Sequence, residues 1–291
     1  LVRGQITNVD PIAGMMNPMA FQQTLHMTLA SYTATGFAVG GIHALLLLIE
    51  PNNAFHRRAL AIALTVGAPA AVLQPISGDI SARSVARYQP AKLAAMEAHF
   101  ETAAAVPLTI GGWPDMATGE TRYAIRIPYG LSLLAFHDPN AVVKGLNEFP
   151  RADWPHVPIV HTAFQIMVAL GSYLALLSLW IGWMALRRKD LVANRLLLGG
   201  IALAAPMGFI AIEAGWTVTE VGRQPWIIYG VLRTADAVTP MPGLVVPFVL
   251  FTLLYCFLGG IVAWLLYRQI IRSPKATEWT RTYSPAGVAR G

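Results

Sequence analysis

Residues 158–186, PIVHTAFQIMVALGSYLALLSLWIGWMAL, contain no Asp, Glu, Lys or Arg. An α-helix crosses a bilayer with about 20 apolar residues, so this stretch is long enough to span one. Four further stretches are similarly long and apolar: 21–49, 59–76, 195–219 and 243–267. The sequence therefore predicts an all-α, polytopic transmembrane helix bundle with about five spans. Pro206 should kink the fourth span, because proline lacks an amide donor and crowds the preceding turn.

The composition agrees with a membrane protein. Of the 291 residues, 55% are hydrophobic and only 12% are charged, whereas a soluble domain carries about 25% charged residues. The net charge of +6 does not indicate a nucleic-acid-binding protein, because the basic residues lie largely at the ends of apolar stretches. Cys256 is the only cysteine, which excludes an intrachain disulfide, an iron–sulfur cluster with several cysteine ligands and a covalent c-type haem.

The basic clusters predict the orientation of the chain. They fall at alternate ends of the spans, at 56–58, 187–189 and 268–272. Short loops rich in Lys and Arg remain cytoplasmic, so we expect residue 1 outside, the C-terminus in the cytoplasm and one large external loop. The expected regions are an N-terminal segment with two spans (1–76), the external loop (77–157), three spans (158–272) and a cytoplasmic tail (273–291).

Two side chains could bind a metal within the outer half of the membrane. His26 lies slightly more than one helical turn inside the first span, and Met167 lies in the third span. An ionisable group at this depth is commonly functional, and an imidazole with a thioether suits a six-coordinate, low-spin haem iron. We expect the two helices to be neighbours. The alternative is an interfacial histidine and a methionine that fills a gap in the core.

The end of the fourth span carries a second cluster. Glu213, Trp216 and Glu220 share one helix face through their i, i+3, i+7 spacing. Carboxylates near the membrane boundary are costly unless they are paired, protonated or bound to a metal or cofactor. A pair of exposed interfacial acids is the alternative.

The external loop contains a predicted amphipathic helix over residues 89–102. Lys92 and Glu97 on it could bind and deprotonate a hydroxyl-bearing ligand, as a donor beside a general base. An ordinary solvated helix face is the alternative.

Several motifs together resemble subunit I of cytochrome bd-type quinol oxidases. Residues 222–226, GRQPW, preceded by Glu220, resemble the family signature. Gly78-Asp79 followed by KLAAMEA at 92–98 resembles the quinol-binding loop, and YAIRIPY at 123–129 resembles a later part of it. The similarity covers nearly the whole chain apart from its tail.

The resemblance implies roles for particular residues. His26 and Met167 match the axial ligands of the low-spin haem b558, and Glu220 matches the carboxylate ligand of haem b595. Trp216 matches a tryptophan among the haems and Arg223 the signature arginine near them. Lys92 and Glu97 match the residues assigned to quinol binding and oxidation, and Asp79 matches a loop aspartate whose role we interpret as structural.

The sequence also departs from the family. Gln165 stands where well-known members carry arginine, and loss of that charge should lower the potential of the haem. The short interval from Lys92 to Met167 resembles the short-loop, cyanide-insensitive-like branch, in which the third site holds haem d or a further haem b. The family has about nine spans, and this chain resembles the last five, which should not complete oxygen reduction alone.

The resemblance thus implies an enzyme of the bacterial inner membrane that oxidises quinol and reduces oxygen to water. The expected partners are subunit II, an optional small single-helix subunit, membrane quinol and oxygen. Two other functions fit the same residues. One is a b-type cytochrome that relays electrons, and the other is a non-redox channel or transporter with Glu213 and Glu220 along an ion path.

Overall fold

The computed structural model describes residues 10–271. The predicted cytoplasmic tail at 273–291 and the first nine residues lie outside this range. Five helical segments are long and apolar enough to cross a membrane, which confirms the predicted fold class. They are α2 (Ala20–Ile49), α3 (Ala54–Tyr88), α6 (Val157–Leu186), α7 with α8 (Arg195–Ala204 and Met207–Gly222) and α9 (Val245–Ile271).

Helix α3 is much longer than the span predicted at 59–76. It begins after Asn53, whose side-chain oxygen accepts hydrogen bonds from the amides of Phe55 and His56 and so caps the first turn. Pro69 and Pro75 lie inside the helix without ending it, since neighbouring helices in a bundle compensate for the lost backbone bond. Residues 77–88, which we expected in the external loop, therefore belong to the helix.

The fourth span is interrupted where the sequence predicted a kink. Helix α7 ends at Ala204, and Pro206 is the N-cap residue of α8. Because proline has no amide hydrogen, the series of helical backbone hydrogen bonds is interrupted at this point and begins again in α8.

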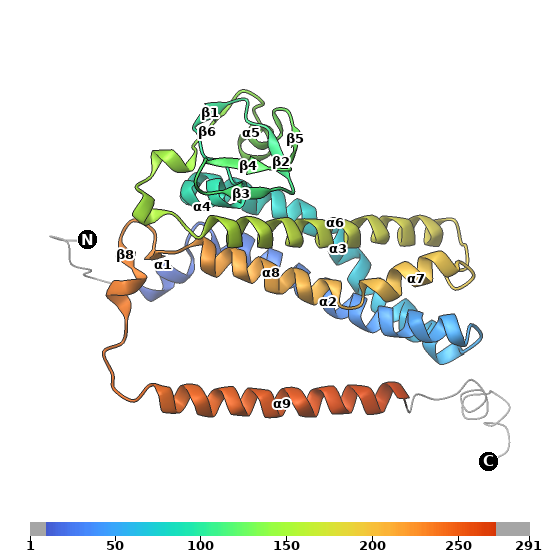
Figure 1. Cartoon of the computed structure of the whole chain (residues 1–291). Coiled ribbons are helices and arrows are strands. Elements are labelled where there is room, and N and C mark those ends of the chain that lie inside the picture. Colours follow the sequence, from blue (N-terminus) through green and yellow to red (C-terminus); the bar gives the residue numbers. More distant parts are fainter. Residues whose placement is uncertain (1–9, 272–291) are drawn as a thin grey trace, which may run out of the picture.

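The spans pack as a bundle in which α3 and α8 each contact both α2 and α6. Helices α2 and α3 approach very closely at Gly36 and Gly67: a Cβ built on Gly36 would lie 2.5 Å from the Cα of Gly67. Small residues at such crossings allow the backbones of membrane helices to touch. The α2–α3 and α6–α7 turns lie at one end of the bundle together with the C-terminal end of α9 (Figure 1), and an ion pair of 3.0 Å between Arg57 and Asp190 joins these two turns.

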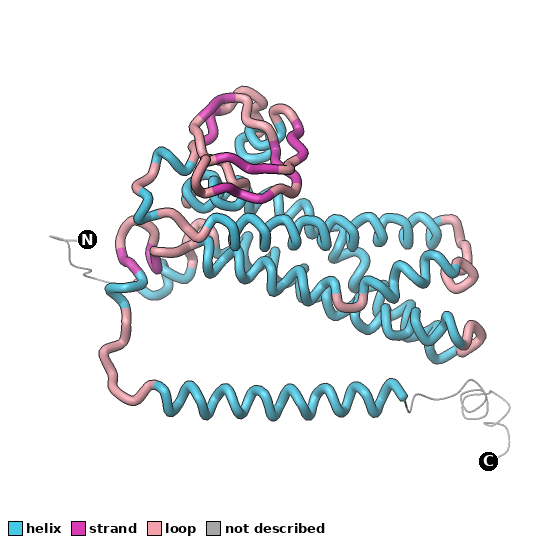
Figure 2. The backbone as a smooth tube through the Cα atoms, viewed as in Figure 1, coloured by secondary structure: helices cyan, strands magenta, loops and turns pink. Residues whose placement is uncertain are grey.

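Between α3 and α6 the chain forms a compact element at the opposite end of the bundle (Figure 1). The helix predicted over 89–102 is shorter than expected: α4 (Pro90–Met96) is followed by Ala98, whose left-handed φ of 48° ends the helix. Three antiparallel strand pairs lie beyond it, which the sequence did not predict. They are β1 (Ala103–Ala104) with β6 (Val142–Val143), β2 (Leu108–Ile110) with β5 (Ile125–Ile127), and β3 (Trp113–Asp115) with β4 (Glu120–Arg122). Figure 2 shows that strands are confined to this element and to the segment after α8.

The remaining elements are short. They comprise α1 (Pro11–Met15), α5 (Gly130–Phe136), β7 (Trp226–Ile228), β8 (Leu232–Arg233) and 3-10 turns at Leu146–Glu148, Arg151–Asp153 and Thr234–Ala237.

Two apolar clusters hold the molecule together. One lies within the bundle and includes Phe37, Leu64 and Leu197. The other joins the external element to α6 and α8 through residues such as Leu93 and Val160. Helix α4 is therefore fixed against the bundle by burial of apolar surface. In contrast, α9 is exposed along the part of its length whose side chains the structure describes.

Candidate functional site

Lys92 is a buried ionisable side chain where the external element meets α8. It lies on α4 with only 8% of its surface exposed, and its methylene stem packs against Gly222 at the end of α8. Burial lowers the pKa of its ammonium group to about 8, while the charge of Glu220 opposes this decrease and that of Arg223 adds to it. The structure thus places Lys92 within electrostatic reach of two residues of the signature segment.

Glu97 is the C-cap residue of α4 and is only 1% exposed. Burial raises the pKa of its carboxyl group to about 8, and the backbone amide of Thr109 opposes the rise. Neither carboxylate oxygen makes a hydrogen bond of ordinary geometry within the described residues. A buried polar group without partners costs free energy, so its retention points to a ligand or a proton-transfer role.

Lys92 and Glu97 therefore belong to one short helix but have different surroundings. Lys92 faces the end of α8, whereas Glu97 lies by the strand that contains Thr109. Both groups have a pKa of about 8, so each changes protonation state close to neutral pH. Such a pair can donate a hydrogen bond to an oxygen atom and accept a proton from a hydroxyl group.

The signature segment lies on a more open surface. Glu220 and Arg223 form an ion pair of 2.6 Å and remain 46% and 42% exposed. Trp216 and Glu213, about one and two turns earlier on α8, are exposed as well. The carboxylates that we grouped on one helix face are thus both on the surface of this chain. Of the two, Glu220 forms an ion pair within residues 10–271, and none is found there for Glu213.

The hydrogen bonds around His26 define which ring nitrogen carries the lone pair that a metal would need. Its Nδ1 lies 2.8 Å from Oγ of Ser77. The Ser77 hydroxyl donates its hydrogen to the carbonyl of Gln74, so the hydroxyl oxygen accepts from Nδ1–H. The lone pair then resides on Nε2, where it accepts a hydrogen bond of 3.2 Å from the side-chain amide of Gln74. A metal bound at Nε2 would replace this donor, and the bond from Nδ1 would keep the ring oriented.

Met167 lies on α6, diagonally across the bundle from His26 rather than on a neighbouring helix, because α3 and α8 each pack between α2 and α6. A Cβ built on Gly215 would lie 2.9 Å from the sulfur of Met167, so this glycine leaves space at the thioether. Facing helices of a bundle are where cofactors are usually held. The imidazole and the thioether thus form a donor set that fits a haem, although their contacts run to α3 and α8 rather than to each other.

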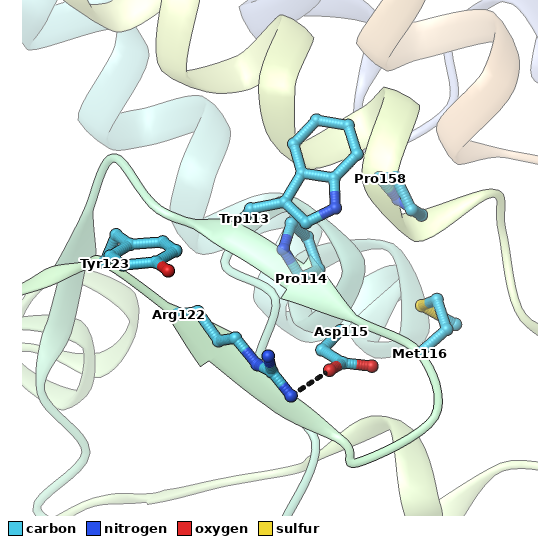
Figure 3. Close-up of a pocket in the computed structure, with 7 residues that line it drawn as sticks. All are labelled: Trp113, Pro114, Asp115, Met116, Arg122, Tyr123 and Pro158. Carbon is cyan, nitrogen blue, oxygen red and sulfur yellow. Dashed lines mark ion pairs between the residues drawn. The ribbon is translucent and has the colours of Figure 1, made fainter.

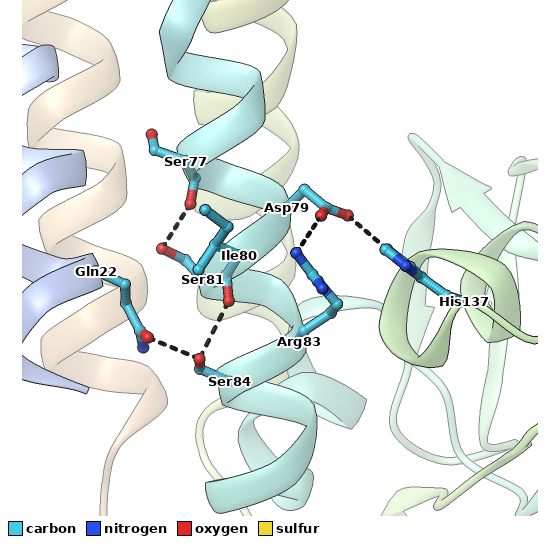
Figure 4. A network of polar contacts seen from close by, with 8 residues as sticks. All are labelled: Gln22, Ser77, Asp79, Ile80, Ser81, Arg83, Ser84 and His137. Carbon is cyan, nitrogen blue, oxygen red and sulfur yellow. Dashed lines mark hydrogen bonds and ion pairs between the residues drawn. The ribbon is translucent and has the colours of Figure 1, made fainter. Parts of the chain in front are cut away.

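Asp79, for which the resemblance implied a structural role, makes two contacts with charged or titratable side chains. Its carboxylate pairs with Arg83 at 2.9 Å and approaches His137 at 3.6 Å (Figure 4). His137 ends α5, so the contact joins the external element to α3. On the same part of α3, Ser84 donates a hydrogen bond to Gln22 of α2.

Sequence reasoning missed His161 on α6. The ring is fully buried, with Nδ1 2.8 Å from the carbonyl of Met96 and Nε2 3.1 Å from that of Gly111. Gln165, one turn later, also bonds the backbone of this loop. The signal was present in the sequence, because a histidine and a glutamine at i, i+4 interrupt an otherwise apolar span.

A shallow pocket of about 430 Å³ opens beside the β3–β4 hairpin (Figure 3). It is lined by Trp113, Pro114, Asp115, Met116, Arg122, Tyr123 and Pro158, and none of these was a predicted site residue. An ion pair of 2.6 Å between Arg122 and Asp115 forms part of its wall.

The fold and these residues define a class: a multi-pass helical membrane protein with a buried acid and base in its largest inter-helix element. Comparison with known proteins agrees. The family model described as cytochrome bd terminal oxidase subunit I matches residues 1–274. The chain belongs to this family.

Individual relatives give the same result. A Bacillus subtilis (strain 168) protein provisionally named cytochrome bd menaquinol oxidase subunit I is 38% identical over 94% of this chain and 62% of its own length. A second from that organism, a cytochrome bd ubiquinol oxidase subunit 1, is 29% identical over 87% of this chain and 57% of its own. The bd oxidase structure from Geobacillus thermodenitrificans superposes with a TM-score of 0.81 at 36% identity, covering 94% of this chain and 62% of that one. The chain therefore spans about three fifths of these proteins.

Proposed function

We propose that this chain is part of the haem-bearing subunit of a terminal oxidase that oxidises membrane quinol and reduces oxygen to water. The observation that carries the proposal is the burial of Lys92 and Glu97 in the element that packs on α8 beside Glu220 and Arg223. An acid and a base with a pKa near 8 suit the binding and deprotonation of a quinol hydroxyl group. The matching family model supports this reading.

In this proposal the protein performs the proton chemistry. The ammonium group of Lys92 donates a hydrogen bond to a quinol oxygen, and the carboxylate of Glu97 accepts the hydroxyl proton. Among the described residues neither oxygen of Glu97 has a hydrogen bond of ordinary geometry, although the backbone amide of Thr109 acts on the carboxyl group. The apolar surroundings of α4 exclude water, which strengthens both interactions.

The family implies haems, and the residues present fit them. We propose that His26 and Met167 hold the low-spin haem b558 and that Glu220 is a ligand of haem b595, with Trp216 and Arg223 beside it. A third site would take haem d or a further haem b. When bound, the haems supply the electron transfer and the oxygen chemistry. The residues of this chain set ligation and orientation: Ser77 holds the ring of His26, and Gly215 gives the sulfur of Met167 its space.

The proposed setting is the bacterial inner membrane, with the element between α3 and α6 outside and the C-terminus in the cytoplasm. The gathering of the basic α2–α3 and α6–α7 turns at one end of the bundle supports this orientation (Figure 1). We further propose subunit II as a partner, with a small single-helix subunit as an optional one. The exposed surface of α9 is compatible with such contacts.

A spectroscopic experiment tests the haem assignment. In the full-length oxidase that contains this chain, His26→Ala should abolish the low-spin haem signal in the reduced-minus-oxidised spectrum. Ser77→Ala should retain the haem but shift its midpoint potential, because the ring loses the bond that orients it. His43→Ala is the matched control, since His43 lies on the same helix but bonds His56.

An unchanged spectrum for His26→Ala would rule out the ligand assignment. A preparation of the unaltered protein without haem would favour a transporter. Low-spin haem without oxygen consumption would favour an electron relay.

A further inference from the structure

Helix α6 connects the external element to the bundle through polar side chains. His161 lies in its second turn and is fully buried. One ring nitrogen faces the carbonyl of Met96, the residue before Glu97, at 2.8 Å, and the other faces the carbonyl of Gly111 at 3.1 Å. One ring therefore bridges two segments of the loop that are separate in the sequence.

Gln165 completes the contact one turn further along the same face of α6. Its side-chain oxygen accepts a hydrogen bond from the amide of Gly111 at 2.9 Å, and its side-chain nitrogen donates one to the carbonyl of Thr109 at 3.0 Å. The structure thus shows what Gln165 contacts at the position where well-known family members carry arginine. The amide group of Gln165 binds the backbone through both an acceptor and a donor. An arginine could not make the same pair of bonds, because a guanidinium group has no acceptor.

Gly111 is the residue that both side chains bind. Its φ of +66° lies in the left-handed region, which glycine adopts without strain. At this residue the carbonyl faces His161 while the amide faces Gln165.

We propose that His161 and Gln165 are positioning residues for quinol oxidation, which fix the Thr109–Gly111 segment and the Met96–Glu97 turn against the helix that carries Met167. This inference rests on the proposed function. Among the described residues the Glu97 oxygens make no hydrogen bond of ordinary geometry, so the location of the carboxylate depends on the backbone around it. His161 contacts the backbone at Met96, and the amide of Thr109 acts on the Glu97 carboxyl group.

The two side chains, which we call the loop clamp, also join the two proposed sites. Gln165 is two residues from Met167 on α6. Release of the clamp should therefore loosen the quinol site while the haem ligand keeps its own contact with Gly215. A general disruption of folding would instead affect both the quinol site and the haem ligand.

The test uses the assembled full-length oxidase. His161→Phe retains a planar ring but removes both polar contacts of the imidazole with the loop carbonyls, and Gln165→Leu removes the two hydrogen bonds of the amide. Each variant should raise KM for a soluble short-chain quinol about tenfold, the effect of roughly 1.4 kcal/mol, with kcat and the haem spectrum nearly unchanged. Hydrogen exchange in a peptide that covers residues 108–112 should become faster.

Conservative variants make the test specific. His161→Gln retains a donor for one carbonyl and should recover part of the affinity. Gln165→Glu keeps the acceptor for the Gly111 amide but loses the donor, and it should have a smaller effect than Gln165→Leu. Ser178→Ala is the matched control, because Ser178 is buried on the same helix but bonds only the carbonyl of Leu174.

Wild-type KM in Gln165→Leu and Gln165→Glu, with normal haem spectra, would overturn the loop clamp while leaving the proposed function intact. Equal losses of kcat, haem and affinity in every variant would also overturn it, because they indicate a purely structural role. Absence of quinol oxidation by the unaltered oxidase would overturn the proposed function and the loop clamp with it.

Discussion

Two glutamates with assigned roles lie in opposite environments. Glu97 is buried in the external element, without a hydrogen bond from the described residues, and its pKa is raised to about 8. Glu220 lies on an open face of α8 and pairs with Arg223. The first carboxyl group stores an unfavourable free energy, and the second is stabilised by water and by a neighbouring charge.

This difference in burial shows how far the described residues enclose each of the two proposed sites. Lys92 and Glu97 are both buried among the described residues, where the external element packs against α6 and α8. Trp216 is 59% exposed, and Glu213 and Glu220 share its surface. In the proposed high-spin haem site, the described residues therefore supply one face of α8, and the haem would lie against its exposed side.

The largest effect is expected at Glu97. Glu97→Gln removes the proposed base and should reduce quinol oxidation at least about 100-fold. In the unaltered enzyme the rate should rise with pH toward about 8, as the buried carboxyl group loses its proton. Steady-state quinol oxidation between pH 6 and about pH 9 tests both statements, and a variant with normal turnover would contradict the assignment.

Glu97 should also make stability depend on pH. Its pKa rises from 4.5 to about 8 on folding, so the folded protein keeps a proton that the unfolded chain releases within this window. Stability then falls as pH increases from about 4.5 to about 8. Thermal unfolding of Glu97→Gln should lack this slope and exceed the unaltered protein in Tm at pH 8. An identical slope in the two proteins would show that Glu97 is not buried in its neutral form.

A moderate effect on KM is expected where Lys92 of α4 contacts the end of α8. A Cβ on Gly222 would lie 3.2 Å from Cε and 3.3 Å from Cγ of Lys92, closer than ordinary contact. Gly222→Ala should displace the ammonium group by a few tenths of an ångström and raise KM for quinol a few-fold, with the haem spectrum retained. The control is Gly199→Ala on α7, where a Cβ meets open space. Equal KM values for Gly222→Ala and Gly199→Ala would show that the position of Lys92 does not affect substrate binding.

The smallest effect is expected for the exposed ion pair. Both partners are more than two fifths exposed, and solvent screens such pairs. A double-mutant cycle with Glu220→Gln and Arg223→Gln should give a coupling free energy of at most about 1 kcal/mol, which decreases further in high salt. Unfolding by denaturant measures it, and a coupling of several kcal/mol would mean that this face is covered.

The sequence by itself determined the spans and the break at Pro206, because hydrophobic length and a missing amide act locally. It also identified Lys92 and Glu97 as an acid and base candidate. It did not predict that α3 extends to Tyr88, since Pro69 and Pro75 normally end a helix and only neighbouring helices compensate for them.

Tertiary structure alone decided the environments of the site residues. The burial of Glu97, the diagonal placement of His26 and Met167 and the bonds of His161 to Met96 and Gly111 all join residues far apart in the chain. Burial, and with it the pKa of a carboxyl group, depends on what packs around a side chain rather than on its sequence neighbours. For that reason the sequence motif identified Lys92 and Glu97, and the packing of α4 against α6 and α8 determines their burial and their pKa values.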